Sequence, residues 1–192
     1  MTTTKAPGPR ERLLASARRL TGAHGVGVGI DAILEDASVA RRSLYQHFAG
    51  KDDLIAQSLL DSADKDEARY RIALERGGDD PRQRVLAVFD QLDRTTSLPE
   101  YRGCRYISAE LGLADPGHPA HLATREFTTR LRGLFETELT NLGHPDPVDG
   151  ADQILVLVEG ILVVGVIAPE SHPALTVRPL VELILDAKTS PA

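Results

Sequence analysis

The stretch ASVARRSLYQHFAGKDDL, residues 37–54, sets two arginines, a tyrosine, a histidine and a lysine between regularly spaced apolar residues. On a helical wheel with 100° per residue, Leu44 and Phe48 share one face, together with Ala40. This spacing predicts a short helix over 41–48 whose apolar side is buried and whose polar side is exposed.

The polar side of that helix carries groups that can recognise nucleic-acid bases. Arg42 and Gln46 lie opposite the apolar face, so both side chains are expected to project outward. Arginine can form two hydrogen bonds with guanine, and glutamine can form two with adenine. A merely solvated face is an equally good interpretation of the wheel alone. Ser43 and Tyr45 lie on the flanks, Arg41 and His47 lie closer to the apolar edge, and Lys51 follows the helix.

A second short helix is predicted directly before this one, over 30–37. Its apolar residues recur at spacings of three and four, and the tripeptide SVA at 38–40 joins it to the next helix. Two short helices with this spacing are typical of a helix–turn–helix, in which the second helix enters a groove of DNA. A further amphipathic helix is expected before them, over roughly 10–22.

Residues 10–54 resemble the DNA-binding region of the TetR family of transcriptional regulators. RERLLASARRL is similar to that family's first helix, IDAILEDASVARRSLYQHF to its helix–turn–helix, and LYQHFAGKDDL to its most specific signature. The resemblance implies a dimer that binds double-stranded operator DNA and responds to a small-molecule effector. It implies phosphate contacts by Tyr45, His47 and Lys51, and base contacts around Arg41, Arg42, Ser43 and Gln46.

Three positions depart from the family's pattern. Ser38 stands where glycine is usual, and serine is strained there if the backbone has positive φ. We therefore expect Ser38→Gly to be neutral or stabilising. Gly29 stands where serine or threonine usually caps the second helix, and Thr21 stands where an aromatic residue usually packs. These departures concern local stability more than function.

The charge of the chain is unevenly placed. The first 51 residues hold eight Lys and Arg against four Asp and Glu, a net of +4, and the rest carries a net of −10. A basic head on an acidic body suits a polyanionic partner that binds the head. The single cysteine excludes an internal disulfide and fits a reducing compartment, so we expect a cytoplasmic protein.

No segment predicts binding to a membrane. The N-terminal MTTTKAPGPR lacks the apolar stretch of a signal peptide. The longest apolar run, 154–168, is shorter than the roughly 20 residues of a spanning helix, and Glu159 interrupts it. A helix buried inside the protein or in a protein interface is the better interpretation.

The sequence predicts an all-α fold with about nine helices, because apolar residues recur at three and four positions and no segment alternates as a half-buried strand does. We expect an N-terminal three-helix, helix–turn–helix DNA-binding domain and a larger C-terminal helical domain for ligand binding and dimerisation. The expected boundaries are a disordered arm at 1–9, the DNA-binding domain at 10–51 and the C-terminal domain at 52–192.

The homodimer is expected to form through helices near 149–167 and 174–187. The first of these is apolar nearly all round, which the surface of a monomer tolerates poorly. Gly160 and Gly165 would allow a close approach of helices, although a wholly internal core helix is the alternative. Pro179 predicts a kink in the second helix or a later start.

The family resemblance implies an effector pocket between about residues 80 and 145. Candidate lining residues come from periodicity, and for each of them a place in the plain core is a better interpretation than contact with a ligand. They are Phe89, Cys104, Tyr106, Ile107, Glu110, Leu111, Phe127 and Leu131.

Enzymatic functions have little support in the sequence. GVGVG at 25–29 has no preceding strand, so it is interpreted as a connection rather than a phosphate loop. Cys104 has no histidine that can be assigned as its base, and His118 and His121 lack an assignable third metal ligand. We expect no enzyme, no cofactor and no metal. The alternative function is a helical small-molecule-binding protein whose head does not read an operator.

Overall fold

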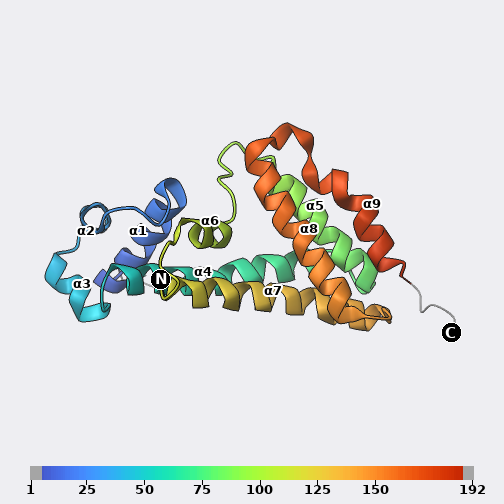
Figure 1. The fold of residues 1–192 in the computed structure, drawn as a ribbon, viewed down its shortest axis with the longest axis horizontal. Helices are drawn as coiled ribbons and strands as arrows, with labels where there is room; N and C mark the ends of the chain where they lie inside the picture. Colours follow the sequence, from blue (N-terminus) through green and yellow to red (C-terminus); the bar gives the residue numbers. More distant parts are fainter. Residues whose placement is uncertain (1–5, 188–192) are drawn as a thin grey trace, which may run out of the picture. The chain divides into compact units, whose positions relative to one another are not determined.

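The computed structural model describes residues 6–187, and in that range the chain forms nine α-helices, one 3₁₀ turn and no strand (Figure 1). The predicted all-α fold class is therefore confirmed. The elements are α1 (Pro9–His24), α2 (Ile30–Ala37), α3 (Arg41–His47), α4 (Lys51–Glu75), α5 (Pro81–Thr96), α6 (Arg105–Gly112), α7 (Ala120–Leu142), α8 (Pro147–Ile167), η1 (Pro169–Ser171) and α9 (Pro173–Leu185).

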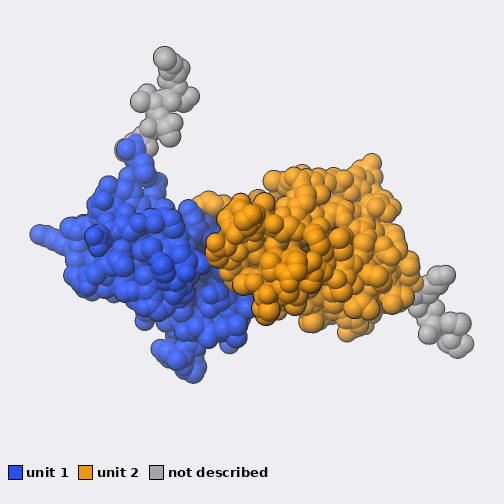
Figure 2. Space-filling model, turned by 90° about the horizontal axis from the view of Figure 1, so that it is seen from above, with its two compact units in different colours: residues 1–64, 105–126 blue, residues 65–104, 127–192 orange. Residues whose placement is uncertain are grey.

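The helices belong to two compact units (Figure 2). Unit 1 consists of the chain up to Asp64 and the segment Arg105–Glu126, so it contains α1 to α3, α6 and the first parts of α4 and α7. Unit 2 consists of Lys65–Cys104 and the chain from Phe127 onward. The segment that contains α6 thus belongs to the same unit as the helix–turn–helix.

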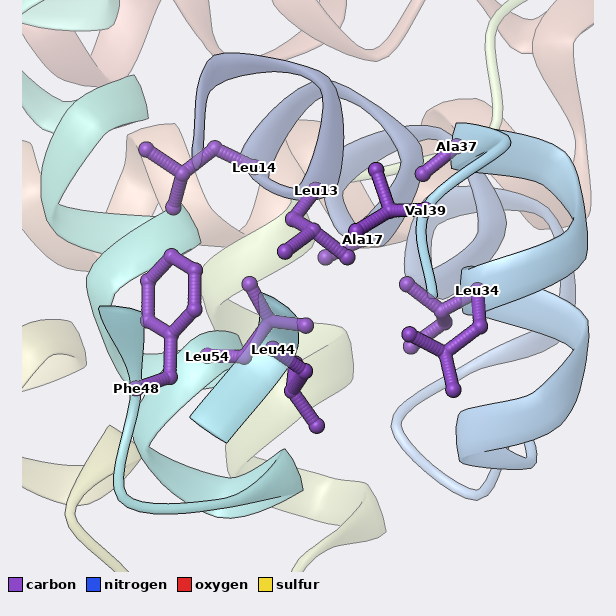
Figure 3. Close-up of a cluster of buried hydrophobic side chains, with 10 residues drawn as sticks. Leu13, Leu14, Ala17, Leu34, Ala37, Val39, Leu44, Phe48 and Leu54 are labelled. Atoms are coloured by element: carbon purple, nitrogen blue, oxygen red, sulfur yellow. The ribbon is translucent and has the colours of Figure 1, made fainter. Parts of the chain in front are cut away.

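Unit 1 is held together by apolar side chains from α1, α2, α3 and the start of α4 (Figure 3). Leu13, Ile33 and Leu44 are completely buried, one from each of the first three helices. Burying such a side chain contributes about 1.5–3 kcal/mol, so the three helices stabilise one another through this core. The full cluster is Leu13, Leu14, Ala17, Ile33, Leu34, Ala37, Val39, Leu44, Phe48 and Leu54.

Helix α1 begins slightly earlier than the sequence predicted. Pro9 is its first residue, a position where the missing N–H costs nothing. The Gly8 N–H donates a hydrogen bond of 3.0 Å to the Glu11 carboxylate, which caps the first turn. Pro9 therefore belongs to the helix and not to the expected disordered arm, while residues 1–5 of that arm lie outside the described residues.

Unit 2 is built around α5, α8 and α9, which contact one another pairwise. Phe89 of α5, Ile161 of α8 and Val181 of α9 are all buried, at 1 % exposure or less. Helix α7 joins this group through Glu138, whose buried carboxylate accepts two hydrogen bonds of 2.9 Å from the Arg84 guanidinium of α5. An apolar core and one buried ion pair thus hold the unit together.

Helix α8 is apolar on more sides than it buries. By length and composition it is the one helix within residues 6–187 that could cross a membrane. Ile154, Val158 and Ile161 are buried, which is the behaviour of a core helix in a folded domain. The opposite side exposes Val156 and Ile167, with exposed fractions of 68 % and 76 %.

Helix α9 spans Pro173–Leu185 with Pro179 in its interior. Of the two expected consequences of Pro179, the late start is therefore wrong, and the kink stays a prediction. The N-terminal residue Pro173 occupies the first turn, where proline is favoured. Val181 and Leu185 are buried, whereas Leu180 and Leu183 are exposed. Like α8, α9 therefore has one apolar side inside unit 2 and another outside it.

Candidate nucleic-acid interface

Helix α3 exposes the polar face that the helical wheel predicts. Leu44 is completely buried and Phe48 is 3 % exposed, whereas Arg42 and Gln46 lie at the surface, so these orientations are confirmed. Ala40 is exposed, contrary to the wheel. The reason is that Ala40 is the N-cap residue, with an extended backbone (φ −67°, ψ 145°) that does not follow the helical repeat.

The other side chains predicted to contact DNA also reach the surface of unit 1. Arg41, Tyr45 and His47 are exposed, and Ser43 and Lys51 are half-buried. Lys51 is the first residue of α4 rather than a loop residue. The structure thus brings these residues together on α3 and the adjoining helix start, and their contacts with DNA remain predictions.

The turn between α2 and α3 has the left-handed backbone that the sequence raised as a possibility. Ser38 adopts φ 51° and ψ 49°, a conformation that costs a residue with a Cβ about 1–2 kcal/mol. The Val39 N–H donates to the Leu34 carbonyl at 3.0 Å, which closes the end of α2. Gly29 is the N-cap residue of α2 and provides no side-chain hydrogen bond, as its position predicts.

Arg41 is held by two neighbours on the exposed side of the helix–turn–helix. Its guanidinium forms an ion pair with Asp31 in the first turn of α2. The contact with Asp31 raises the pKa of Arg41 most, and a hydrogen bond with Tyr45 raises it further. The guanidinium therefore stays charged. The sequence offered no reason to single out Asp31, because an acidic residue in the first turn of a helix is common.

The start of α4 is fixed against the end of α3. The Ala49 N–H donates to the Asp53 carboxylate at 2.8 Å, and the Gln57 side chain donates to the same carboxylate at 2.9 Å. The Arg10 guanidinium lies 5.6 Å from the centre of the Phe48 ring. These contacts define the position of Lys51 relative to α3.

The connection between α6 and α7 is tied to the helices of unit 1 by two histidines. The Nε2 atom of His118 lies 3.3 Å from the Asp52 carboxylate, next to Lys51, and its Nδ1 accepts from the Ala120 N–H at 3.1 Å. His121 contacts the Glu110 carboxylate at 2.9 Å. The two histidines thus have different partners, and no group of three or more His, Cys, Asp or Glu within 6–187 is arranged to hold a metal ion.

The GVGVG segment at 25–29 is the connection between α1 and α2. Val26 is 8 % exposed and packs against Gly112 at the end of α6. A Cβ added at Gly112 would come within 2.8 Å of the Val26 side chain. The segment therefore serves packing inside unit 1.

Four of the residues predicted to line an effector pocket lie on α6, in unit 1. Tyr106 is buried and its hydroxyl donates to the Leu59 carbonyl at 3.5 Å, and Ile107 is half-buried. Glu110 accepts a hydrogen bond of 2.6 Å from the Thr124 hydroxyl. Leu111 is 83 % exposed, because the short helix buries Tyr106 and Ala109 and turns Leu111 outward. Leu111 is therefore not an interior residue.

The other four candidates lie in unit 2. Phe89, Phe127 and Leu131 are buried, and Cys104 is half-buried. Two further residues of unit 2, Tyr70 and Glu159, were not predicted from the sequence as candidates, and Tyr70 lies near enough to Cys104 to feel its charge. Burial raises the pKa of the Tyr70 phenol most. Cys104 and other acidic groups, including Glu159, raise it further. The sequence signal that could have identified Glu159 is its position as the one acidic residue within the apolar run 154–168.

Comparisons with known proteins agree on one family. Residues 13–57 match the sequence profile described as bacterial regulatory proteins, tetR family. The chain is 23 % identical over 154 residues to the HTH-type transcriptional regulator YjdC of Escherichia coli K12, covering 80 % of this chain and 81 % of that protein.

Two solved structures match nearly the whole chain. A tetR transcriptional regulator from Streptomyces avermitilis is 32 % identical, with a TM-score of 0.78 and coverage of 94 % of this chain and 97 % of that one. SCO4454, a TetR-family regulator from Streptomyces coelicolor, is 30 % identical, with a TM-score of 0.78 and coverage of 92 % and 94 %. The chain therefore belongs to the TetR family of DNA-binding, helix–turn–helix transcriptional regulators, which are not enzymes.

Proposed function

We propose that this regulator is a cytoplasmic homodimeric repressor, which binds a two-fold operator through α3 and leaves it when a small molecule binds. The observation that carries the proposal is the exposed polar face of α3, backed by buried Leu44 and Phe48. A short helix whose apolar face is firmly packed and whose opposite face carries long polar side chains suits insertion into the major groove.

The residues on this face divide into two roles. Arg42 and Gln46, at the centre of the face, read bases, together with Arg41 and Ser43. Tyr45, His47 and Lys51, on the flank and at the start of α4, contact phosphates and set the register of the protein on DNA.

The exposed apolar sides of α8 and α9 support a homodimer. Val156, Val163 and Ile167 of α8 are exposed, and Leu180 and Leu183 of α9 are exposed by 50 % and 69 %. A second copy of the chain would bury these side chains and give the two recognition helices that a two-fold operator requires. Within residues 6–187, a Cβ added at Gly160 would meet no side chain or neighbouring helix within 4 Å, so another helix can approach closely there.

Release from DNA requires that the effector favours one conformation of the dimer over another. We place the effector among the residues of unit 2. Arg105, the first residue of α6, directly follows Cys104 of that unit, and α6 contacts α1 of the DNA-binding unit. A ligand next to Cys104 can therefore act on the head through the chain segment that leads into α6.

The experiment that tests the DNA-binding role is selection of bound duplexes from a random pool, followed by salt titration on the selected sequence. A near-palindromic motif is expected. Arg42→Ala should weaken binding to that motif by about 10-fold or more while changing random DNA little, because a good base contact contributes about 1–3 kcal/mol. Lys51→Ala should weaken both and lower the salt slope by about 1.

Arg94→Ala provides the matched control, because Arg94 is an exposed arginine of unit 2. It should change neither affinity nor salt slope. Equal losses on motif and random DNA for Arg42→Ala would contradict its base-reading role. No enriched motif even at low salt would favour the alternative function, a small-molecule-binding protein whose head does not read an operator.

A further inference from the structure

One side of α8 places an acidic side chain among aromatic residues of unit 2. Asp152, Glu159 and Val166 follow one another at intervals of seven residues and so share this side. Asp152 forms an ion pair with Arg132 of α7, and the Val166 side chain lies against Gly103, where a Cβ would approach it to 3.1 Å. Glu159, between them, therefore faces α7 and the segment that precedes α6.

Aromatic residues lie on the segments that pack beside this part of α8. The Tyr101 hydroxyl donates to the Leu162 carbonyl of α8 at 2.8 Å, one turn from Glu159. Tyr70 of α4 lies with its ring centre 6.5 Å from that of Phe127 of α7. Tyr70, Tyr101 and Glu159 are half-buried, so each keeps some surface accessible to a small molecule. We call Tyr70, Tyr101, Cys104, Phe127 and Glu159 the Tyr70 cluster.

Glu159 has no counter-ion within the described part of the chain. No hydrogen bond or ion pair reaches its carboxylate there, and burial alone raises the pKa of this group. The groups that act on the Tyr70 phenol after burial are all acids: Cys104, Tyr101, Asp66 and Glu159. Cysteine and tyrosine side chains are ordinarily uncharged at neutral pH, and Asp66 pairs with Arg69 at 2.8 Å. Glu159 is therefore the acid among these groups whose charge no ion pair within the described residues compensates.

The open cavity of unit 2 shows the opposite arrangement. It has a volume of about 450 Å³ and is lined by residues of α4, α5 and α7. Its charged residues other than Glu75 are paired within the protein: Arg84 pairs with Glu138 at 2.9 Å, and Glu67 pairs with Arg71 at 2.6 Å and with Arg130 at 3.6 Å. A ligand there would have to break existing ion pairs, whereas a cation at Glu159 would break none.

We propose that the Tyr70 cluster binds an organic cation with an aromatic ring, whose positive charge pairs with Glu159 and whose ring packs on Tyr70 and Phe127. Half-buried aromatic rings and an unmatched carboxylate attract a weakly hydrated ammonium group more strongly than a neutral molecule of the same shape. This inference rests on the proposed function, in which a small molecule controls the regulator, and names the chemical class of that molecule.

The test uses trimethylphenylammonium and its neutral isostere tert-butylbenzene as probes, with the full chain and isothermal calorimetry. The ammonium compound is expected to bind at least about 10-fold more tightly than tert-butylbenzene, because the two differ only in charge. Glu159→Gln should remove this preference. Glu170→Gln, which alters an exposed acid of the same unit, should keep it.

Variants of Tyr70 separate the ring from the hydroxyl. Tyr70→Phe should retain binding of the ammonium probe, and Tyr70→Leu should weaken it. Circular dichroism identifies a variant that has failed to fold. Equal affinity for the charged and neutral probes, an unchanged dissociation constant in Glu159→Gln, or no binding of the ammonium probe to the native chain at millimolar concentration would each overturn the proposal.

Operator release is measured separately, by adding the ammonium probe to the protein–DNA complex. Binding that depends on Glu159 but leaves the DNA complex intact would support the site and its ligand class, and would contradict ligand-controlled release. Release that persists in Glu159→Gln would support ligand control and overturn the proposed site. The two proposals can therefore fail independently.

Discussion

The exposed faces of α3 and of α8 with α9 differ in what they need from a partner. Helix α3 exposes charged and amide groups such as Arg42 and Gln46, which water already solvates. Helices α8 and α9 expose Val156, Ile167 and Leu183, which water solvates poorly. The first face can exist without DNA and should bind it in a salt-dependent way. The second needs a lasting apolar partner.

The largest effect should come from placing a charge on the apolar face. Val156→Lys puts an ammonium group where a second copy of the chain is expected, and burying it there without a partner is costly. We expect a monomer by light scattering and a loss of operator affinity of about 100-fold or more, because each monomer can hold only one half-site.

Ile72→Lys is the matched control, because Ile72 of α4 is 51 % exposed in the same unit. It should leave both the mass and the operator affinity unchanged. A Val156→Lys variant that remains a dimer with native affinity would show that this face is not the dimer interface. The contrast between the two exposed faces would then lose its basis.

A smaller effect is expected from the acidic residue on the DNA side of α2. Asp31→Asn removes the ion pair that holds Arg41 and also removes a negative charge near the expected phosphates. Binding to random duplex should tighten, and the preference for the operator should fall by up to about 10-fold, the equivalent of one weakened base contact. Competition binding at fixed salt measures both quantities.

The control for this variant is Glu35→Gln, which removes another exposed acid of the same helix. It should strengthen binding to all DNA slightly and keep the preference. If Asp31→Asn also keeps the preference, then Asp31 acts only through its charge and does not position Arg41.

The DNA-binding head could be predicted from the sequence because its rules are local. One buried residue per turn, Leu44 and then Phe48, fixes which way Arg42 and Gln46 point. Positive φ at Ser38 was raised as a possibility by the family resemblance, in which glycine is usual at this position, and Ser38 has φ 51°. The one misplaced residue of this face, Ala40, lies at the cap, where the helical repeat does not apply.

The proposed small-molecule site could not be predicted in the same way, because it depends on contacts between distant segments. Periodicity identified Phe89, Phe127 and Leu131 as inward-facing, but it cannot separate a core residue from a ligand contact. Leu111 also fits an inward period and is exposed, since α6 ends one residue later. The role proposed for Glu159 depends on Tyr70, which is far away in the sequence.

A pH-dependent effect is expected at the α6–α7 connection of the head. Both ring nitrogens of His121 face acceptors, the Glu110 carboxylate and the Asp115 carbonyl, each at 2.9 Å, so only the protonated ring satisfies both. The hydrogen bond with Glu110 raises the pKa of His121 most, and the Asp115 carbonyl raises it further, while the charge of Arg125 lowers it. The hydrogen bond from the Thr124 hydroxyl lowers the pKa of Glu110 most, and the contact with His121 lowers it further.

The sign of the pH dependence follows from these directions. The contribution of His121 is complete below its unfolded pKa of about 6.5 and is lost as pH rises through the higher folded value. The contribution of Glu110 to stability is present above its unfolded pKa of about 4.3 and is lost as pH falls through its lower pKa in the folded protein. His121→Gln should therefore lower the melting temperature most between about pH 4.5 and 6.5, and less in alkaline buffer.

Thermal melting of the native chain and the variant across this range checks the prediction. His24→Gln, at an exposed histidine of α1, is the control and should give a difference that hardly varies with pH. A difference for His121→Gln that grows with rising pH would contradict the protonated state assigned to His121.

The smallest effect concerns the turn that presents α3. Ser38→Gly removes a Cβ from a left-handed residue, which gains about 1–2 kcal/mol, and adds flexibility to the unfolded chain, which costs about 0.5–1 kcal/mol. The balance is neutral to about 1.5 kcal/mol stabilising, and each kcal/mol raises the melting temperature by about 2–4 °C.

Glycine at a helical position of the neighbouring helix should have the opposite effect. Glu35→Gly, in the interior of α2, pays the cost of flexibility without relieving strain and should destabilise the chain by about 1 kcal/mol. The difference in sign between the two variants, rather than either value, isolates the backbone strain at Ser38. If Ser38→Gly also lowered the melting temperature by several degrees, the hydroxyl of Ser38 would have to stabilise the turn by more than its backbone costs.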